Sequence, residues 1–579
     1  MAVEKYRSFQ AWYQIPFDEK WTQRSWPQAR VTKAPRWCTV DLRDGNQALI
    51  NPMNHEKKLR LYLHLLKLGY REIEVGFPAA SQTDFDFIRH IIDNDLVPDD
   101  VFIQVLTQCR KDLIERTIEG VKGCKNVVLH VYNSTSELQR RVVFKKGREE
   151  IKALAVSGVS LVRQLADEKL KGVNVRLEYS PESFTGTELD FALEVCEAVM
   201  DVWKPTPENQ VILNLPSTVE MCTPNVYADQ IEWMCAHISR RDCVCISIHP
   251  HNDRGTGIAA AELAMMAGAD RVEGCLFGNG ERTGNVCLVT LALNLFTQGI
   301  DPDVSYTELE ETIKISEYCT ELKVPERYPW AGSLVYTAFS GSHQDAIKKG
   351  LEATKKQQLW EVPYLPIDPQ DIGRHYEALI RVNSQSGKGG IAFLLETEYG
   401  ISLPKDCQAE FAKVVQKISD ETGKEISAAQ IYEAFQKTYV FPQEPMALLD
   451  YEMSNTGTFK DDSDVIVKAR VRAGAAEYEI HGQGNGPVSA FVAGINKKVF
   501  APKGLEVHLS DYHSVARSAC RNAEGSEAVC AVRCQALRDG EKQGKSAFGV
   551  GLHRNTTTAV LRAVISAINC LGGDAKLFA

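Results

Sequence analysis

The chain has 579 residues, more than one ordinary core can organise, since single hydrophobic cores stop growing at roughly 250 to 300 residues. Hydrophobic residues make up 44% and charged residues 25%, values typical of folded globular domains, so no long disordered segment is expected. The net charge of -10 comes without a cluster of Lys and Arg. This charge distribution argues against nucleic acid or a membrane surface as partner and favours small molecules.

The 16 cysteines are scattered, and none form the CxxC pairs that build a structural zinc site. In a chain of this length they indicate reduced, mostly buried thiols. The first thirty residues lack the apolar core of a signal peptide, and the chain has no run of about 18 apolar residues. We therefore expect a cytoplasmic protein, although an organellar form that has lost its transit peptide would look the same.

Short β-rich runs alternate with helical stretches in the first half of the chain, as at 55–67, where leucines recur at helical spacing. The predicted strands are 37–42, 72–77, 101–106, 127–132, 173–179, 211–215, 244–249 and 272–277. Eight such units favour a (β/α)8 TIM barrel over an open doubly wound sheet. The first strand is followed by Asp44-Gly45-Asn46-Gln47 and not by a glycine-rich dinucleotide fingerprint, which supports the barrel.

Helical segments dominate after about residue 298, with loops rich in Pro, Gly and Asp at 362–369 and 383–390. The last part is strand-rich and repeats a pattern of paired strands followed by a helix. The two copies are 465–471, 476–481 and a helix from 488, then 527–537, 545–550 and a helix over 556–571. We therefore predict an N-terminal extension and catalytic barrel over 1–330, helical linker subdomains over 331–440, and an α+β regulatory domain with an internal ββα-type repeat over 441–579.

Each copy of the repeat carries a glycine-bearing loop before its helix, with Gly484 and Gly486 in the first and Gly549 and Gly551 in the second. Backbone N–H groups at helix starts bind anions, including carboxylates. The domain could therefore hold a small acidic metabolite such as an amino acid. The alternative is that these glycines only make tight turns.

Polar side chains gather where the predicted barrel strands end, and barrel enzymes carry their chemistry at that end. His249 and His251 close the seventh strand two residues apart, so both imidazoles point to the same side. Asp44 follows the first strand, and one carboxylate with two imidazoles leaves open positions on a divalent ion. The adjacent Arg43 can donate to a developing oxyanion. The structural alternatives are a histidine pair that caps the core and a solvated loop acid.

Two motifs, LRDGxQ at 42–47 and IxxHxHNDxGxG at 246–257, resemble the signatures of the 2-isopropylmalate synthase and homocitrate synthase family of barrel metallo-lyases. The layout of the whole chain, with 362–373 and 381–390, is similar to the long form within that family. The resemblance implies an acyltransferase that condenses acetyl-CoA with 2-oxoisovalerate to give 2-isopropylmalate, the first committed step of leucine biosynthesis. It also implies a C-terminal domain that binds leucine as a feedback inhibitor.

The resemblance further implies which residues form the metal site. Asp44, His249 and His251 would hold a divalent ion (Mg, Mn or Zn), and Asn285 would complete or support the shell. A monovalent cation such as K could assist.

The resemblance assigns the substrate side in the same way. Thr218 would bind the keto acid carboxylate, and His130, Tyr132 and Ser180 would line the pocket. Arg43 would steady the alkoxide or enolate oxygen.

The base has two candidates in the family, Glu182 and His343, with Tyr364 nearby. Because His343 follows the barrel, it could reach the active site of the partner in a homodimer.

Several readings stay open at this point. Homocitrate and citramalate synthases share the metal motifs, and a carbon–carbon lyase would run the bond-making step backwards. A non-catalytic metabolite sensor is opposed by the intact Arg43 and metal ligands. The second glycine loop also departs from the family, because His553, Arg554 and Asn555 stand where acidic residues are expected.

Overall fold

The computed structural model describes residues 15–338, 340–355, 359–376, 388–422, 426–442, 444–456, 464–517 and 527–575. The chain forms two compact units, the first made of Met1–Val335 and Ile367–His375 and the second of Tyr336–Pro366 and Tyr376–Ala579. Most of the loop predicted at 383–390, and of the similar segment 381–390, lies outside the described residues.

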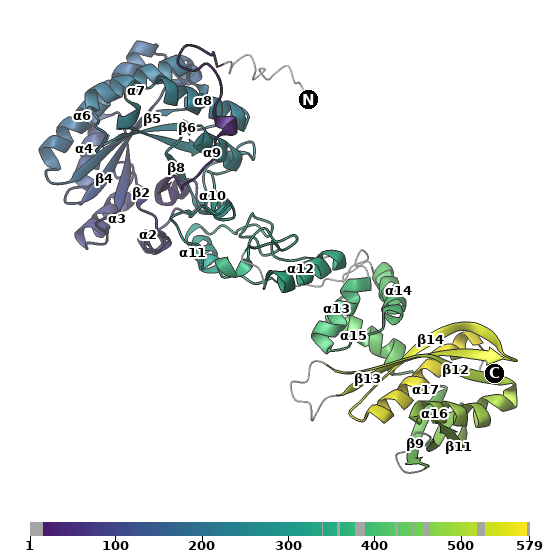
Figure 1. Ribbon diagram of the computed structural model, residues 1–579. Helices are drawn as coiled ribbons and strands as arrows, with labels where there is room; N and C mark the ends of the chain where they lie inside the picture. Colours follow the sequence, from purple (N-terminus) through teal and green to yellow (C-terminus); the bar gives the residue numbers. More distant parts are fainter. Residues whose placement is uncertain are drawn as a thin grey trace. The chain divides into compact units, whose positions relative to one another are not determined.

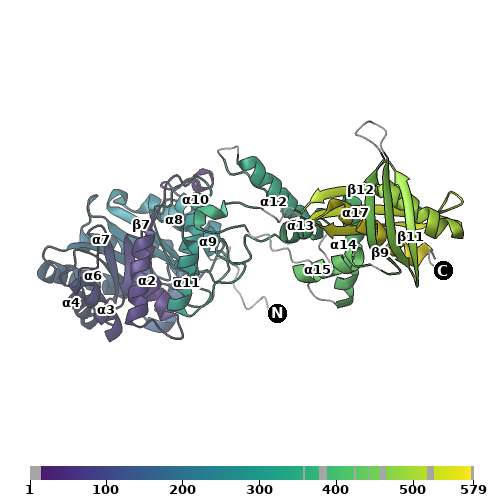
Figure 2. The same cartoon turned by 90° about the horizontal axis from the view of Figure 1, so that it is seen from below.

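Eight parallel strands close into a barrel in the first unit, with β1 paired to β8, so the predicted (β/α)8 fold is confirmed (Figure 1). The strands are β1 (Arg36–Thr39), β2 (Glu72–Gly76), β3 (Phe102–Gln108), β4 (Asn126–Ser134), β5 (Asn174–Glu182), β6 (Val211–Ser217), β7 (Val244–Pro250) and β8 (Arg271–Gly274). The principal helices are α2 (His55–Leu68), α3 (Gln82–Asp93), α4 (Lys111–Gly120), α6 (Arg148–Lys169), α7 (Leu189–Trp203), α8 (Pro224–His237), α9 (Gly257–Met266), α10 (Leu288–Phe296) and α11 (Leu309–Thr320). Figure 2 shows helices such as α2, α3, α4 and α6 on the outside of this unit.

Helix α2 shows how local sequence sets an element of this barrel. The Asn54 side chain caps its first turn by accepting from the Lys57 N–H, and Gly69 ends it in the left-handed region at φ 103°. Leu61 and Leu65 are buried on one face. The helix therefore packs one apolar stripe against the barrel and leaves its other face to solvent.

Strand β1 ends at Thr39, earlier than the predicted range 37–42, because the chain turns there into a short π-helix, Asp41–Gly45. The buried Asp41 carboxylate fixes this turn by accepting from Thr39 Oγ1 at 2.6 Å and from the Leu276 backbone N–H at 3.1 Å. Strand β8 likewise ends at Gly274 instead of reaching residue 277. The ends of β1 and β8 are thus tied together, which places the loop that carries Arg43 and Asp44 at the mouth of the barrel.

The interior of the barrel is unusually polar. Arg271, fully buried, lies among three buried carboxylates, with Glu72 at 2.6 Å, Glu273 at 2.9 Å and Glu178 at 3.3 Å. Gln104 accepts from Arg271 Nη2 at 2.8 Å. A buried ion network of this kind does little for stability by itself, but it fixes the positions of its members.

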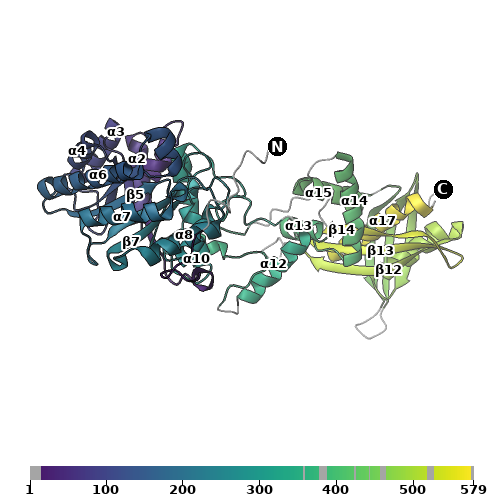
Figure 3. The ribbon, with the colours of Figure 1, turned by 90° about the horizontal axis from the view of Figure 1, so that it is seen from above.

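The second unit begins with helices and ends with two three-stranded antiparallel sheets (Figure 3). Its helices are α12 (Gly341–Thr354), α13 (Lys388–Tyr399), α14 (Lys405–Thr422), α15 (Ala428–Phe435), α16 (Pro487–Ile495) and α17 (Thr556–Ala575). Its strands are β9 (Met446–Asn455), β10 (Val465–Ala473), β11 (Ala476–Gly484), β12 (Leu505–Ala516), β13 (Ala528–Arg538) and β14 (Glu541–His553). The predicted repeat is present, and the structure adds a strand, β9 or β12, at the start of each copy.

The second sheet has an apolar core on each face. Cys530 and Val532 belong to the core shared with α16 and α17, whereas the neighbouring Val529 and Ala531 belong to the core of the helices α13 to α15. This alternation follows from the two-residue period of a strand, which sends successive side chains to opposite faces.

A segment before the barrel lies against α8. Trp21 Nε1 donates to Glu232 at 2.9 Å, and Trp26 Nε1 donates to Asp229 at 2.8 Å. Both acids are buried, and the indoles share them with Arg24, which pairs with Asp229, and with the Ser25 N–H, which donates to Glu232. Among the helices in the described ranges, we find none with the length and apolar character needed to cross a bilayer.

Candidate active site and metal centre

A cavity of about 200 Å³ opens at the C-terminal ends of the barrel strands. Nine of the predicted site residues line it: Arg43, Asp44, His130, Tyr132, Ser180, Glu182, Thr218, His249 and His251. They come from the ends of β1, β4, β5, β6 and β7, as expected for a barrel enzyme. Residues spread over more than 200 positions of the sequence therefore share one cavity.

Asp44, His249 and His251 form a group whose ligand atoms all lie within 4.8 Å of one another. Asp44 Oδ2 is 3.5 Å from His249 Nε2, and the two imidazole rings stack with centroids 5.3 Å apart. The Nδ1 atom of His251 is buried and has no hydrogen-bond partner among the described residues. A buried ring nitrogen without a partner is costly unless something else binds it, so this group fits a metal ion.

Asn285 joins the two kinds of ligand. Its Oδ1 lies 3.0 Å from His249 Nε2, and its Nδ2 donates to Asp44 Oδ2 at 2.8 Å. Asn285 is buried and reaches the site from the segment after β8. Asn285 therefore contacts both an imidazole and the carboxylate of the group, and its part in a metal shell stays a prediction.

The pKa values of the three residues depend on their burial and on one another. Burial alone would raise the pKa of Asp44, but Arg43, His249 and His251 hold it well below its usual range. Burial would lower the pKa of His249, yet its hydrogen bonds to Asp44 and Glu273 raise it to about 10. Burial and the neighbouring His249 lower the pKa of His251 to about 4. Asp44 ionised and His251 neutral are the protonation states in which both can ligate a metal, whereas His249 has to release its Nε2 proton when an ion binds.

A second group that could hold a metal comprises Glu74, His130 and Glu273. Its oxygens already accept strong hydrogen bonds: Glu74 Oε2 lies 2.8 Å from His130 Nδ1 and 2.7 Å from Gln104 Nε2. Arg271 Nη1 lies 2.9 Å from Glu273 and supplies a positive charge there. We interpret these three residues as hydrogen-bonding partners that support the group of Asp44, His249 and His251.

Arg43 is held rigidly at the edge of the cavity. Its Nε donates to Glu74, and its Nη1 donates to Asp44 at 2.6 Å. Burial would lower the pKa of Arg43, but the Glu74 and Asp44 carboxylates raise it above its usual value. A guanidinium fixed in this way stays charged and needs no reorganisation to meet a developing negative oxygen.

The other residues predicted to bind substrate are held by hydrogen bonds within the cavity, and their role stays a prediction. Thr218 Oγ1 accepts from the Ser183 backbone N–H at 2.9 Å. His130 Nε2 lies 2.8 Å from Ser180 Oγ, and Tyr132 Oη accepts from Gln108 at 2.8 Å. These bonds orient the side chains, which is how a site gains precision from a rigid barrel.

Glu182 stands at the end of β5 and lines the same cavity. The Ser134 hydroxyl, at the end of β4, donates to its carboxylate. The other two predicted catalytic residues, His343 and Tyr364, belong to the second unit, where their rings stack with centroids 4.1 Å apart. Their part in catalysis stays a prediction.

Sequence reasoning missed several residues of the site. Glu273 and Arg271 lie beneath the metal group, and Glu281 and Arg282 line the cavity mouth. Arg282 donates to Asp253 at 2.6 Å, and its Nη2 donates to the Thr218 carbonyl oxygen, also at 2.6 Å, which links the loops after β6, β7 and β8. Part of the signal was present, since Glu273 is a charged residue inside the predicted strand 272–277, with Arg271 directly before it.

Barrel and site together define a metal-binding enzyme of the HMGL-like class, and the HMGL-like family model matches residues 34–315. Residues 333–396 match "Alpha-isopropylmalate synthase, post-catalytic domain-like", and 425–571 match "LeuA allosteric (dimerisation) domain". The chain belongs to the 2-isopropylmalate synthase family, a family of acyltransferases.

Individual relatives match over nearly the whole chain. It is 55% identical to the 2-isopropylmalate synthase of Parafrankia sp. (strain EAN1pec), over 98% of this chain and 97% of that one. It is 54% identical to the 2-isopropylmalate synthase of Rhodospirillum rubrum, over 95% and 96% of the two chains.

Proposed function

We propose that the chain condenses acetyl-CoA with 2-oxoisovalerate and water to give 2-isopropylmalate and CoA, the first committed step of leucine biosynthesis. The observation that carries this proposal is the meeting of Arg43, Asp44, His249 and His251 in one cavity, in a chain 55% identical to a named 2-isopropylmalate synthase. The described cysteines form no disulfides, which agrees with the cytoplasm as the site of this metabolism.

Asp44, His249 and His251 would hold the divalent ion, with Asn285 supporting them. One carboxylate and two imidazoles suit Mg, Mn or Zn, and when bound the ion supplies Lewis-acid polarisation of the keto group. A monovalent cation such as K stays a prediction to which we assign no residue.

Thr218 is placed to bind the keto acid carboxylate. Because its oxygen already accepts from Ser183, the hydroxyl proton remains available for the ligand. Phe77, Leu106 and Pro216 give the cavity an apolar wall beside Tyr132. Such a wall suits an isopropyl group better than the second carboxylate of 2-oxoglutarate.

Glu182 is our candidate for the base that takes a methyl proton from acetyl-CoA. The electron pair of that C–H bond forms the new bond to the keto carbon, and Arg43 steadies the negative oxygen that results. Water then cleaves the thioester, the sulfur leaves as the CoA thiol, and the carboxylate remains on the product. His343, stacked on Tyr364, is the alternative base.

If His343 acts from the partner subunit, the homodimer is catalytically necessary. Mixed dimers of His343→Ala and Glu182→Ala chains would then regain activity, because one of their two sites holds an intact pair. No recovery in mixed dimers would place both residues in one subunit or remove His343 from the reaction.

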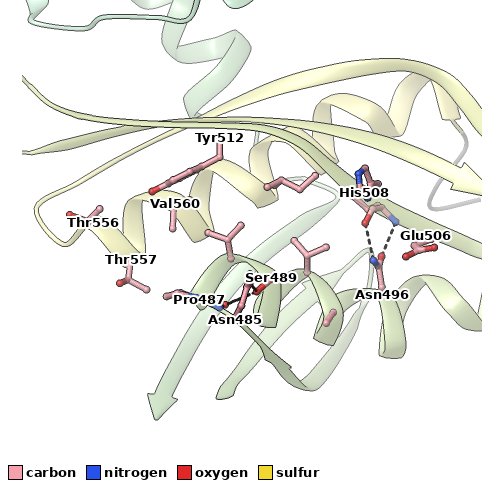
Figure 4. Close-up of a pocket in the computed structure, with 16 residues that line it drawn as sticks. Asn485, Pro487, Ser489, Asn496, Glu506, His508, Tyr512, Thr556, Thr557 and Val560 are labelled. Atoms are coloured by element: carbon pink, nitrogen blue, oxygen red, sulfur yellow. Dashed lines mark hydrogen bonds between the residues drawn. The ribbon is translucent and has the colours of Figure 1, made fainter. Parts of the chain in front are cut away.

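We further propose that leucine binds in the second unit as an effector. A cavity of about 620 Å³ lies between α16, β12 and α17 (Figure 4). Helices α16 and α17 both begin at its edge, at Pro487 and Thr556, so their N-terminal N–H groups can receive a carboxylate. Val488, Val492 and Val560 offer apolar contact, and Glu506 offers a partner for an ammonium group.

The four predicted regulatory glycines divide into two kinds. Gly486 lines the cavity and caps α16, with open space where a Cβ would stand. Gly484, Gly549 and Gly551 lie where a helix backbone approaches the strand, so a Cβ there would collide with it. Asn555, one of the residues that differ from the family pattern, accepts from the Thr558 N–H at 3.1 Å and so caps α17.

Release of CoA thiol from acetyl-CoA tests the reaction, screened against 2-oxoisovalerate, pyruvate and 2-oxoglutarate with and without a chelator. We expect release with 2-oxoisovalerate that the chelator abolishes. Release only with pyruvate would indicate a citramalate synthase, only with 2-oxoglutarate a homocitrate synthase, and with none of them a lyase or a sensor. Unchanged inhibition by millimolar leucine after truncation at Pro442 would refute the effector site.

A further inference from the structure

Glu273 lies directly behind one of the metal-ligand candidates. It belongs to β8, is fully buried, and its Oε2 is 2.8 Å from Nδ1 of His249. The other ring nitrogen of His249, Nε2, is the one that faces Asp44. A carboxylate on the far nitrogen of a metal-binding histidine fixes the tautomer and the ring plane, and makes the histidine a stronger donor.

The carboxylate of Glu273 is itself immobilised. Its Oε1 accepts from Arg271 Nη1 and from Gln104 Nε2, both at 2.9 Å, and its Oε2 also accepts from Asn214 at 3.1 Å. Arg271 is anchored on its other side by Glu72 at 2.6 Å and donates to Ser247 at 2.8 Å. Glu273 therefore cannot rotate away from His249 without breaking a buried network.

The two histidines differ in the surroundings of their Nδ1 atoms. His251 Nδ1 has no hydrogen-bond partner in the described part of the chain and is free for an ion, whereas His249 Nδ1 lies against a buried carboxylate. His249 therefore faces Asp44 with Nε2 and contacts Glu273 through its other nitrogen.

We propose that Glu273, held by Arg271, is a positioning residue that sets the tautomer and orientation of His249 as a metal ligand. The Nδ1 proton of His249 is donated to Glu273, which leaves the Nε2 lone pair directed at the ion. This inference rests on the metal site of the proposed function, and it adds that metal affinity depends on a residue outside the ligand shell.

Glu178 provides a matched control. It is equally buried in the same network, 3.3 Å from Arg271 Nη1 and 3.3 Å from His130 Nε2. Burial and the neighbouring Glu273 raise the pKa of Glu178 well above its usual value, and Gln keeps the size and shape of its side chain. Replacing it perturbs the barrel interior without removing the support of His249.

The test is calorimetric titration of metal-stripped protein with Mn²⁺, for wild type, Glu273→Gln and Glu178→Gln. We expect Glu273→Gln to weaken Mn²⁺ binding by about 10- to 100-fold and Glu178→Gln to change it by less than about 3-fold. Equal affinity in Glu273→Gln and wild type would overturn the proposal, as would equal losses in the two variants. A wild type that binds no Mn²⁺ would instead contradict the metal site of the proposed function.

Should Glu273→Gln not fold, Glu273→Asp decides the question. It keeps the charge that Arg271 needs but withdraws the carboxylate by one methylene from His249. We expect it to fold and to lose Mn²⁺ affinity, with an altered visible spectrum of the Co²⁺ form. Wild-type affinity and spectrum in Glu273→Asp would overturn the proposal.

Discussion

Lys58 Nζ donates a hydrogen bond to the backbone carbonyl oxygen of Leu42 at 3.0 Å, from a position with no solvent exposure. The same ammonium lies 2.5 Å from Asp84 Oδ1. Leu42 belongs to the π-helix that carries Arg43 and Asp44. The helix α2 lysine therefore ties the catalytic loop to the first turn of α3.

We expect Lys58→Met to destabilise the first unit by about 3 to 5 kcal/mol, because it leaves a buried carboxylate and a carbonyl without their donor. Urea unfolding followed by tryptophan fluorescence measures this change. The control is Lys67→Met, also on α2, which removes an exposed ion pair with Glu311 of α11 and should leave the midpoint nearly unchanged. Similar midpoints for the two variants would show that the buried pair does not stabilise the loop.

Asp41 gives the first unit a pH-dependent stability. Burial raises the pKa of Asp41 to about 7, against its hydrogen bonds from Thr39 and Leu276. Because the folded state holds the proton more tightly than the unfolded state, unfolding releases it. The stabilisation that protonated Asp41 gives the folded state is therefore complete below the unfolded pKa of about 4, and it is lost as pH rises towards 7.

Asp41→Asn removes this titration, so its stability relative to wild type should increase by roughly 1.4 kcal/mol per pH unit between about pH 4 and 7. Denaturant unfolding of both proteins at several pH values gives the difference in their free energies of unfolding. The other titrating groups are the same in both proteins, so their contributions cancel. A constant difference across this range would contradict a raised pKa for Asp41.

Asp44 is the only acidic ligand of the proposed metal group, so Asp44→Asn should remove most of its affinity for divalent ions. Since a bound ion contributes several kcal/mol to transition-state stabilisation, we expect kcat/KM to fall by about 100-fold or more. CoA release and Mn²⁺ titration measure the two effects. The exposed Asp112→Asn is the control, and an active Asp44→Asn would exclude Asp44 as a ligand.

The barrel could be predicted from sequence because eight short β-rich runs alternate with helical stretches. Every residue of β6 and β7 is buried, and their predicted ranges agree with the structure to within two residues. The end of β1 could not be predicted, since it depends on the bond from Leu276 to Asp41, 235 positions away. Likewise β9 is mostly exposed, so it has little of the apolar periodicity that reveals a strand.

The shared orientation of the two histidines could be predicted and the support behind His249 could not, for a related reason. His249 and His251 are two apart on one strand, and that spacing is local information. The support behind His249 needs Glu273 and Gln104, which meet only when the barrel closes. Local patterns thus indicate ligands, while the groups that orient them depend on closure.

Gly551 and Gly486 separate the packing role of the C-terminal glycines from their binding role. A Cβ on Gly551 would collide with the Ala559 carbonyl oxygen in α17, so Gly551→Ala should destabilise the second unit by about 1 to 3 kcal/mol. Gly486 has an extended φ of -171° and open space around it, so Gly486→Ala should unfold like wild type. Because Gly486 lines the cavity, the added methyl should still weaken leucine inhibition several-fold, measured as the leucine concentration that halves CoA release. Unchanged inhibition in a folded Gly486→Ala would move the effector away from this end of the cavity.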